Sequence, residues 1–339
     1  MANTGNSAIA STEVFKPTPT LLYPLLVKRL LSKYREPMLF AMGATDKSSE
    51  IAGAKTRQVD FKKFGTIPRG GKLLETDKVP LNNISAESVS LTIYEWGNGA
   101  LMTEAARAWN SIDPLNELMD ELAFDARKVH DNAIRDTYYT TTNSKFAGNK
   151  AIDTLAAGDK FSFDLMEDLT TLGRTQKMFP FYNSAIGNYF ICYISPIHEQ
   201  QLRQEMLNGD SDGVKAKMWI PVANYRPGLQ PLMGEVGMYN NIRFISTPEL
   251  LQGVDSDATD SYDSDLDPAG AGSSANVKTL TAILTGREGV AWADQKLPGL
   301  RFNSEDFDRL QEAAWIAYFG TQLLQAQSVL KIYTSSSVA

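Results

Sequence analysis

The stretch that decides the fold is residues 55–96, "KTRQVDFKKFGTIPRGGKLLETDKVPLNNISAESVSLTIYEW". Apolar residues alternate with polar ones around Val59 and Phe61, and they do so again around Val89 and Leu91. This alternation is typical of β-strands. The segment between the two strands is rich in glycine and proline and poor in large apolar side chains, so it cannot build a core of its own. The stretch therefore predicts an extended arm that is held in place by contacts outside itself.

The arm carries a local positive charge. From Lys55 to Lys78 it has seven basic and three acidic residues, a net charge of +4, which leaves −11 for the rest of a chain whose net charge is −7. Because opposite charges attract, we expect the arm to lie on the acidic body of another copy of the chain. The residues expected to make these inter-subunit contacts are Lys62, Lys63, Arg69, Lys72 and Lys78. The alternative is a nucleic-acid-binding loop, for which Phe61 and Phe64 would be the stacking platforms.

The composition is that of an ordinary globular protein. The 339 residues are 43% apolar and 22% charged, which suits one large domain or two smaller ones. The single cysteine, Cys192, excludes an internal disulfide and lies in an apolar run, so we expect a buried thiol. The apolar run at 21–31 is too short to span a membrane and lacks the flanks of a signal peptide. These features favour a cytoplasm-like compartment and no membrane partner.

The clearest helix signal covers residues 114–138. Asp113 suits the N-cap position and Pro114 the first helical position. Apolar residues then recur at spacings of three and four, without glycine or proline, as on one face of a helix. A helix of this length would be roughly 40 Å long, far above the mean for globular domains.

Further elements follow from local patterns. Helices are predicted at 21–36, at 162–178 with a capping box from Asp164 to Glu167, at 195–209 with Ser195 as N-cap, and at 307–324. Strands are predicted at 188–194, 235–247 (a hairpin turning at Asn240–Asn241), 277–285 and 328–335. We expect Gly97 and Gly99 to end the strand that returns from the arm. No strand–helix–strand rhythm repeats, so the pattern predicts an α+β fold with mixed sheets.

The sequence offers little that could support catalysis. It has two histidines, His130 and His198, and the helix that begins at His198 lacks the second histidine of a zinc-protease motif, with Leu202 in that place. Phosphate-binding loops and nucleophile elbows are also absent from the sequence. We therefore predict no catalytic residue, no cofactor and no metal, and we read both histidines as structural.

The acidic segment at 251–276 has six aspartates and no basic residue. Its spacing fails the calcium-loop pattern, and it is predicted to be an exposed insertion. Two alternatives are a loose divalent-cation site shared with another chain and a metal-dependent hydrolase that uses Asp255, Asp257 and Asp260.

Several motifs in order resemble those of the major capsid proteins of tailed bacteriophages. They are "VDFKKFGTIP", "KVPL", "SVSLTIYEWGNGALMTE", the long helix begun by Asp113 and Pro114, "GEVGMYNNIRFISTPEL" and "AAWIAYFGTQLLQAQSVLKIYTS". The chain is most similar to the family typified by the capsid protein of phage N-four, which has the Hong Kong 97-like capsid fold. The resemblance covers roughly residues 20–335.

The resemblance implies a domain organisation. Residues 1–40 would form an N-terminal arm, and 55–90 the extended loop that reaches over a neighbouring subunit. Residues 41–54 and 91–180 would form the peripheral domain, with a spine helix at 114–138. Residues 181–320 would be mainly the axial domain, with the insertion at 251–276. Residues 321–339 would form a C-terminal strand that returns to the peripheral domain.

The resemblance also implies partners and a location. Hexamers and pentamers of the chain would build an icosahedral head that encloses double-stranded DNA without sequence-specific contacts. A portal would be a further partner, with scaffolding or decoration proteins as separate chains, since no long scaffolding segment precedes residue 20. Assembly would occur in the host cytoplasm, and the product would be the virion. We expect no lysine–asparagine cross-link through Asn82 or Asn83. A nanocompartment shell of the same fold is the alternative.

Overall fold

The computed structural model describes residues 38–51, 56–64, 67, 69–72, 75, 78–79, 81, 86–105, 114–150, 155–156, 158–208, 218–226, 228–250, 279–305 and 309–335. These residues fall into two compact units. Unit 1 contains residues 95–129 and 296–318, and unit 2 contains residues 37–94, 130–295 and 319–339. The predicted helix at 21–36, the cap Asp113 and the acidic insertion at 251–276 lie outside the described residues.

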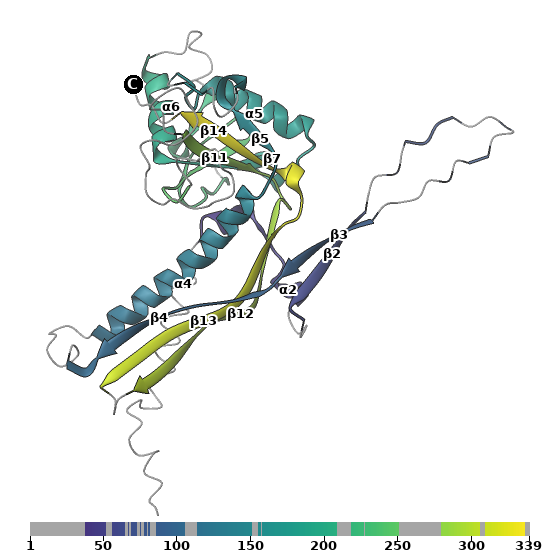
Figure 1. Ribbon diagram of the computed structural model, residues 1–339. Coiled ribbons are helices and arrows are strands. Elements are labelled where there is room, and N and C mark those ends of the chain that lie inside the picture. Colours follow the sequence, from purple (N-terminus) through teal and green to yellow (C-terminus); the bar gives the residue numbers. More distant parts are fainter. Residues whose placement is uncertain are drawn as a thin grey trace, which may run out of the picture. The chain divides into compact units, whose positions relative to one another are not determined.

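Helices and strands are mixed along the chain (Figure 1). The helices are α2 (Ser48–Ile51), α4 (Pro114–Tyr139), α5 (Phe163–Thr175) and α6 (Pro196–Asn208), with short 3-10 helices η2 (Phe40–Gly43), η3 (Ala147–Asn149), η6 (Val222–Asn224) and η7 (Ala326–Ser328). The strands are β1 (Thr45–Asp46), β2 (Gln58–Phe64), β3 (Ala86–Thr92), β4 (Tyr94–Thr103), β5 (Ser144–Phe146), β6 (Phe181–Asn183), β7 (Gly187–Ile194), β8 (Ile220–Pro221), β9 (Glu235–Tyr239), β10 (Ile242–Ser246), β11 (Thr279–Thr285), β12 (Val290–Glu305), β13 (Leu310–Leu323) and β14 (Val329–Ser335).

The strands form three sheets. The largest has the order β5-β14-β11-β7-β10-β9-β8, with β6 paired to β7; a second has the order β1-β12-β13-β4; and β2 and β3 pair with each other. Parallel pairs (β10 with β7, β14 with β5) occur beside antiparallel ones (β11 with β7 and with β14). The predicted α+β fold with mixed sheets is confirmed.

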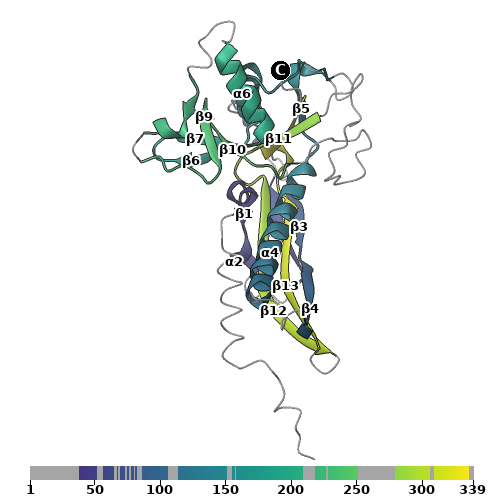
Figure 2. The same cartoon turned by 90° about the vertical axis from the view of Figure 1, so that its left-hand side faces the viewer.

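Strand β7 lies inside the large sheet of unit 2 and is covered on both faces. On one face, Cys192 and Ile194 belong to the same apolar cluster as residues of α5 and α6. On the other face, Ile191 and Tyr193 belong to a cluster that includes the last turns of α4 and Phe40 of η2. Figure 2 shows α6 beside this sheet. A strand buried on both faces needs the continuous apolar run that predicted it.

Unit 1 is a layer of strands from β4, β12 and β13 packed against the first turns of α4. Met119 and Leu122 of α4 are buried there together with Trp315 of β13. Asp125 joins the helix to two strands, because its carboxylate accepts hydrogen bonds from the Trp315 indole at 2.9 Å and from the Asn98 amide at 3.0 Å.

The predicted helix at 307–324 is wrong. The segment is strand β13, in which Ala313, Trp315, Ala317 and Phe319 are buried at every second position. Its alanine, leucine, glutamine and glutamate residues favour helix locally, but pairing between neighbouring strands overrides that preference. The neighbouring long strand β12 was not predicted, because proline and glycine interrupt its pattern.

Two local predictions also need correction. Gly97 and Gly99 do not end a strand; they lie inside β4, where a Cβ at Gly97 would be 2.8 Å from the Trp315 carbonyl oxygen. Glycine is used there because the backbone of β13 comes close. Helix α5 is capped by Ser162, whose hydroxyl accepts a hydrogen bond from the Leu165 amide at 3.3 Å, and not by Asp164.

The other predicted elements agree with the structure to within about three residues at their ends. Helix α4 covers the predicted 114–138 and one residue more. The β9–β10 hairpin turns at Asn240 and Asn241, whose φ angles of 44° and 69° are tolerated by asparagine. Strand β14 pairs with β11, so the C-terminal strand shares a sheet with a segment that the sequence assigned to a different domain.

Candidate inter-subunit arm

The arm predicted at 55–90 is built on a two-stranded antiparallel sheet. Strands β2 and β3 pair in register from Gln58 opposite Thr92 to Phe64 opposite Ala86. Among the described residues, neither strand pairs with any other sheet. An isolated two-stranded sheet is marginally stable in water. The pairing therefore needs further support, either at its base or along its length.

Four of the five predicted contact residues have side chains that face solvent. Lys62, on β2, and Arg69, Lys72 and Lys78, in the segment beyond it, are all exposed. The backbone of Lys63 pairs with Glu87, and its side chain lies outside the described residues. The structure thus keeps positive charge on the surface of the arm, as the sequence predicts; what these side chains contact stays a prediction.

The arm also exposes apolar side chains. The exposed fractions are 51% for Ile67, 66% for Val79 and 95% for Leu81. Single exposed apolar residues are common on protein surfaces, but these three lie in one segment without a core. The sequence analysis considered only the charges of this segment and missed this second feature.

One acidic side chain is satisfied within the arm. The Asp60 carboxylate accepts hydrogen bonds from the Ser90 hydroxyl at 2.6 Å and from the Gln58 amide at 3.1 Å. These two bonds, the one from Ser90 first, lower the pKa of Asp60. Since Asp60 and Ser90 are directly opposite each other, this pair helps to fix the register of the two strands.

The base of the arm is anchored in unit 2. Leu91 and Ile93 are buried, and the Ile93 amide donates a hydrogen bond to the Arg57 carbonyl at 2.8 Å. At Gly320 the chain passes so close to the end of β3 that a Cβ would be 2.2 Å from the Thr92 carbonyl oxygen. The arm is therefore held at its base by its own subunit.

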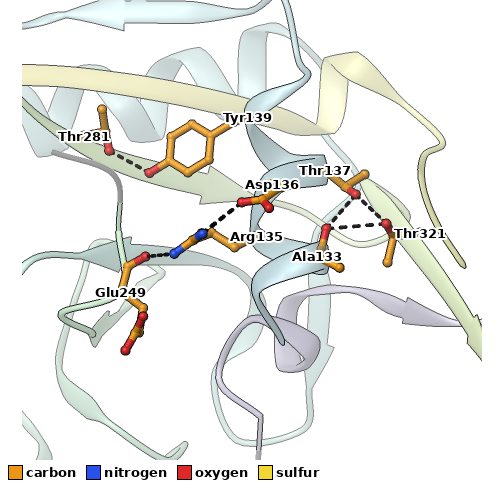
Figure 3. A network of polar contacts seen from close by, with 8 residues as sticks. All are labelled: Ala133, Arg135, Asp136, Thr137, Tyr139, Glu249, Thr281 and Thr321. Atoms are coloured by element: carbon orange, nitrogen blue, oxygen red, sulfur yellow. Dashed lines mark hydrogen bonds and ion pairs between the residues drawn. The ribbon is translucent and has the colours of Figure 1, made fainter. Parts of the chain in front are cut away.

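The body near the end of α4 is held by buried polar contacts (Figure 3). Arg135, which is 4% exposed, donates a hydrogen bond to the Glu249 carbonyl at 2.6 Å. The hydroxyls of Tyr139 and Thr281 lie 2.6 Å apart, and the hydroxyls of Thr137 and Thr321 lie 2.7 Å apart. These contacts tie one helix to β11, β13 and the segment after β10. No residue pattern in the sequence had indicated them.

Both histidines are buried. Nδ1 of His198 accepts a hydrogen bond from the Ser195 amide at 3.1 Å, and its Nε2 lies 2.7 Å from the Thr334 hydroxyl. Burial lowers the pKa of His198 to about 3, so the ring is neutral and caps α6. Burial also raises the pKa of the Cys192 thiol. In the described part of the chain, no group of three or more potential ligands could hold a metal ion.

None of the helices in the described ranges is long and apolar enough to cross a membrane. The aspartates proposed for the alternative hydrolase, Asp255, Asp257 and Asp260, lie outside the described residues.

Comparison with known proteins gives the family and the fold. Residues 108–326, more than half of the chain, match the family model described as phage capsid protein. No curated protein matches the chain. Among solved structures, the capsid of Ralstonia phage GP4 is 16% identical over 87% of each chain, with a TM-score of 0.64. The capsid of cyanophage Pam1 is 13% identical over 87% of this chain and 89% of that one, with a TM-score of 0.66.

The head of Helicobacter pylori bacteriophage KHP40 is 14% identical over 87% of this chain and 88% of that one, with a TM-score of 0.59. At these identities the solved structures establish the fold, which is the predicted Hong Kong 97-like capsid fold. The family match favours a phage shell over a nanocompartment shell or a hydrolase. The chain belongs to the phage capsid protein family, whose members are structural subunits and not enzymes.

Proposed function

We propose that this chain is the major capsid subunit of a tailed phage, and that hexamers and pentamers of it form an icosahedral head around double-stranded DNA. The family match and the capsid fold support a self-assembling shell protein. The portal, separate scaffolding or decoration proteins, packaged DNA and assembly in the host cytoplasm belong to the proposal.

The observation that carries the proposal is the composition of the arm surface. Ile67, Val79 and Leu81 expose apolar area, while Lys62 and Arg69 expose positive charge, on a segment whose described anchoring contacts lie near its base. A surface with both features suits a partner that is apolar at the contact and acidic around it. The rest of this chain has a net charge of −11, so a second copy of the chain would supply the acidic surface.

Ordering such an arm on a neighbour has an energetic consequence. The arm loses conformational entropy when it docks, and the burial of its apolar side chains on the next subunit offsets that loss. Docking on a neighbour therefore stabilises the assembled state by mass action, and it does not stabilise the fold of the isolated subunit. Shell formation should therefore depend on the arm much more than subunit folding does.

The domain assignment made from the sequence stays part of the proposal. Residues 114–138, which lie within α4, would be the spine helix, 55–90 the extended loop, and 181–320 mainly the axial domain. Strand β14, at the C-terminus, pairs with β11.

A single substitution in the arm tests the proposal. Leu81→Asp removes an apolar side chain that is 95% exposed, and the matched control Leu207→Asp changes a leucine of α6 that is 86% exposed. Negative-stain microscopy of the purified full chain should show shells, tubes or capsomer rings for the natural protein and for Leu207→Asp. Leu81→Asp should remain as folded, unassembled subunits.

Two outcomes would count against the proposal. If the natural chain forms only monomers at every salt and protein concentration, the capsid role fails. If Leu81→Asp assembles as well as the control, the shell role stands but the arm does not carry it.

A further inference from the structure

An acid–imidazole cluster around the buried His130 lies in unit 2, close to the point where the chain leads into the arm. The Nε2 atom of His130, on α4, is 3.4 Å from the Oδ1 atom of Asp294, on β12. The Asp294 amide donates a hydrogen bond to the Ser48 hydroxyl oxygen at 3.0 Å. Ser48 in turn donates from its amide and its hydroxyl to the Asp46 carboxylate, at 2.8 Å and 2.5 Å. The cluster thus joins α4, β12 and the residues around β1.

A methionine sulfur contacts the other ring nitrogen of the imidazole. The Nδ1 atom of His130 lies 3.1 Å from the Met38 sulfur. A thioether sulfur can only accept a hydrogen bond, so the contact is attractive when Nδ1 carries the proton. In a neutral ring the lone pair then lies on Nε2 and faces Asp294. A protonated Asp294 can donate to that lone pair, whereas a carboxylate would be repelled by it.

The surroundings favour the same state. The His130 side chain has no exposed area, and its ring makes edge contacts with Trp292 and Phe319, at centroid distances of 5.0 Å and 4.4 Å. Burial lowers the pKa of His130 to about 4. Burial, and secondarily the charge of Asp46, raises the pKa of Asp294 to about 7. The pair is therefore neutral when it holds one proton, and that proton lies on Asp294.

The other charged groups near the cluster are engaged elsewhere. The Lys47 ammonium forms an ion pair with Glu50 at 2.5 Å. The Asp131 carboxylate accepts hydrogen bonds from the amides of residues 39–41 at 2.9–3.3 Å. Among the described residues, His130 and Asp46 are therefore the ionisable groups that act on Asp294 in this cluster.

The cluster is connected to the base of the arm. Strand β1 pairs in parallel with β12, with Asp46 opposite Trp292, and the Lys47 amide donates to the Trp292 carbonyl at 2.9 Å. The Lys47 ammonium also lies over the ring of Phe61, on β2, at 5.6 Å. Residues 45–48 thus touch both β12 and the first strand of the arm.

We propose that the His130–Asp294 pair is a proton-dependent latch that holds residues 45–48, and through them the base of the arm, against β12 and α4. With the proton bound, Asp294 can donate to His130 and carries no charge beside Asp46. When the proton leaves, the Asp294 carboxylate lies beside the Nε2 lone pair and is also repelled by the charge of Asp46. Residues 45–48 then separate more readily from β12. The role in assembly rests on the proposed function of the arm; the latch itself does not.

The direction of the pH dependence follows from the number of protons that the His130–Asp294 pair holds in each state of the chain. Below about pH 6.5 the unfolded chain also holds one proton on this pair of side chains, on the histidine, so global stability changes little through the pair. Above the raised pKa of Asp294, at about 7, the folded pair loses its proton. In local opening, unlike global unfolding, His130 stays packed against Trp292 and Phe319 and stays neutral, while Asp294 moves away from the charge of Asp46. The open form then holds fewer protons than the closed form near pH 7, so the latch is closed at pH 6 and weakened at pH 8.

Hydrogen–deuterium exchange of the full chain tests the latch, with rates corrected for the intrinsic effect of pH. In the natural protein, amides of residues 45–51 should open several-fold more often at pH 8 than at pH 6. Asp294→Asn mimics the protonated acid, because its amide can donate to Nε2, and should abolish this difference. Glu50→Gln, which removes an exposed charge nearby, should preserve it.

A second measurement checks the proton itself. The chain has two histidines, so selective labelling resolves both rings by NMR. His130 should be neutral, with its proton on Nδ1, from pH 5 to 8. A protonated His130 at pH 6, equal opening of residues 45–51 at both pH values, or a misfolded Asp294→Asn variant would each overturn the latch. Microscopy of the same samples distinguishes the capsid role from the latch. If shells form but opening of residues 45–51 does not depend on pH, the latch is wrong and the proposed function is retained.

Discussion

Strand β7 and the arm strands β2 and β3 differ in where their apolar side chains are buried. In β7 every side chain from Phe190 to Ile194 is buried by other parts of the same subunit. In β3 the first three residues are exposed, and burial begins only toward Leu91. The body thus completes its own burial, whereas the described residues of the chain leave the start of β3 and Leu81 uncovered. Subunit stability and assembly should therefore be separable by mutation.

The largest loss of subunit stability is expected from the buried ion pair of the body. Arg243 and Glu235 are 2% and 0% exposed, and the Arg243 guanidinium donates to both carboxylate oxygens, at 2.8 Å and 2.5 Å. Arg243→Met would leave the carboxylate buried without its partner. We expect a fall of about 3–5 kcal/mol in the free energy of unfolding, measured by urea denaturation of unassembled subunits.

Two further variants test whether burial causes the loss expected for Arg243→Met. The double variant Arg243→Met with Glu235→Gln should recover part of the loss, because no buried charge remains. Arg203→Met breaks the exposed ion pair with Glu199 and should cost only about 0–1 kcal/mol. If Arg203→Met and Arg243→Met lower the free energy of unfolding equally, then burial does not explain the contribution of the Arg243–Glu235 pair.

Truncating one leucine in each region compares them directly. Leu284 of β11 is fully buried, so Leu284→Ala should lower the free energy of unfolding by about 2–5 kcal/mol. Leu81→Ala changes a side chain that is 95% exposed and should alter it by less than about 0.5 kcal/mol. Urea midpoints of both variants give the comparison. A clear loss for Leu81→Ala would mean that the arm folds back on its own subunit.

A smaller effect is expected at the base of the arm. The added methyl group of Gly320→Ala would collide with the Thr92 carbonyl and shift β3, at a cost of about 1–3 kcal/mol. Gly70→Ala, in the arm itself, adds a methyl group in open space. Thermal unfolding should separate the two variants. If Gly320→Ala matches the natural protein, the base of the arm is looser than its backbone contact indicates.

The smallest effect on the subunit is expected from Lys62→Glu combined with Lys63→Glu. Unfolding should change by less than about 0.5 kcal/mol, because the Lys62 side chain is exposed. Assembly, followed by light scattering, should weaken most at low salt, where screening of charges is least. Unchanged assembly across a salt series would show that these charges do not guide docking.

Local patterns predicted the elements whose signals agree with their environment. Helix α4 has a long stripe at helical spacing, the β9–β10 hairpin has the asparagine pair that its turn needs, and β7 has the apolar run of a buried strand. The same reasoning failed for β13. Its residues fit a helical stripe and a strand alternation equally well, so local preference could not decide between them.

The sequence by itself determined the positive, core-less arm, the long helix, the mixed α+β composition and the lack of a recognisable catalytic set, because these depend on residue types and spacing along the chain. The tertiary structure decided that β13 is a strand, that Gly97 and Gly320 accommodate close backbones, and that His130 meets Asp294. Those features join segments far apart in the sequence. Their energies come from strand pairing, steric contact and burial, which no local window contains.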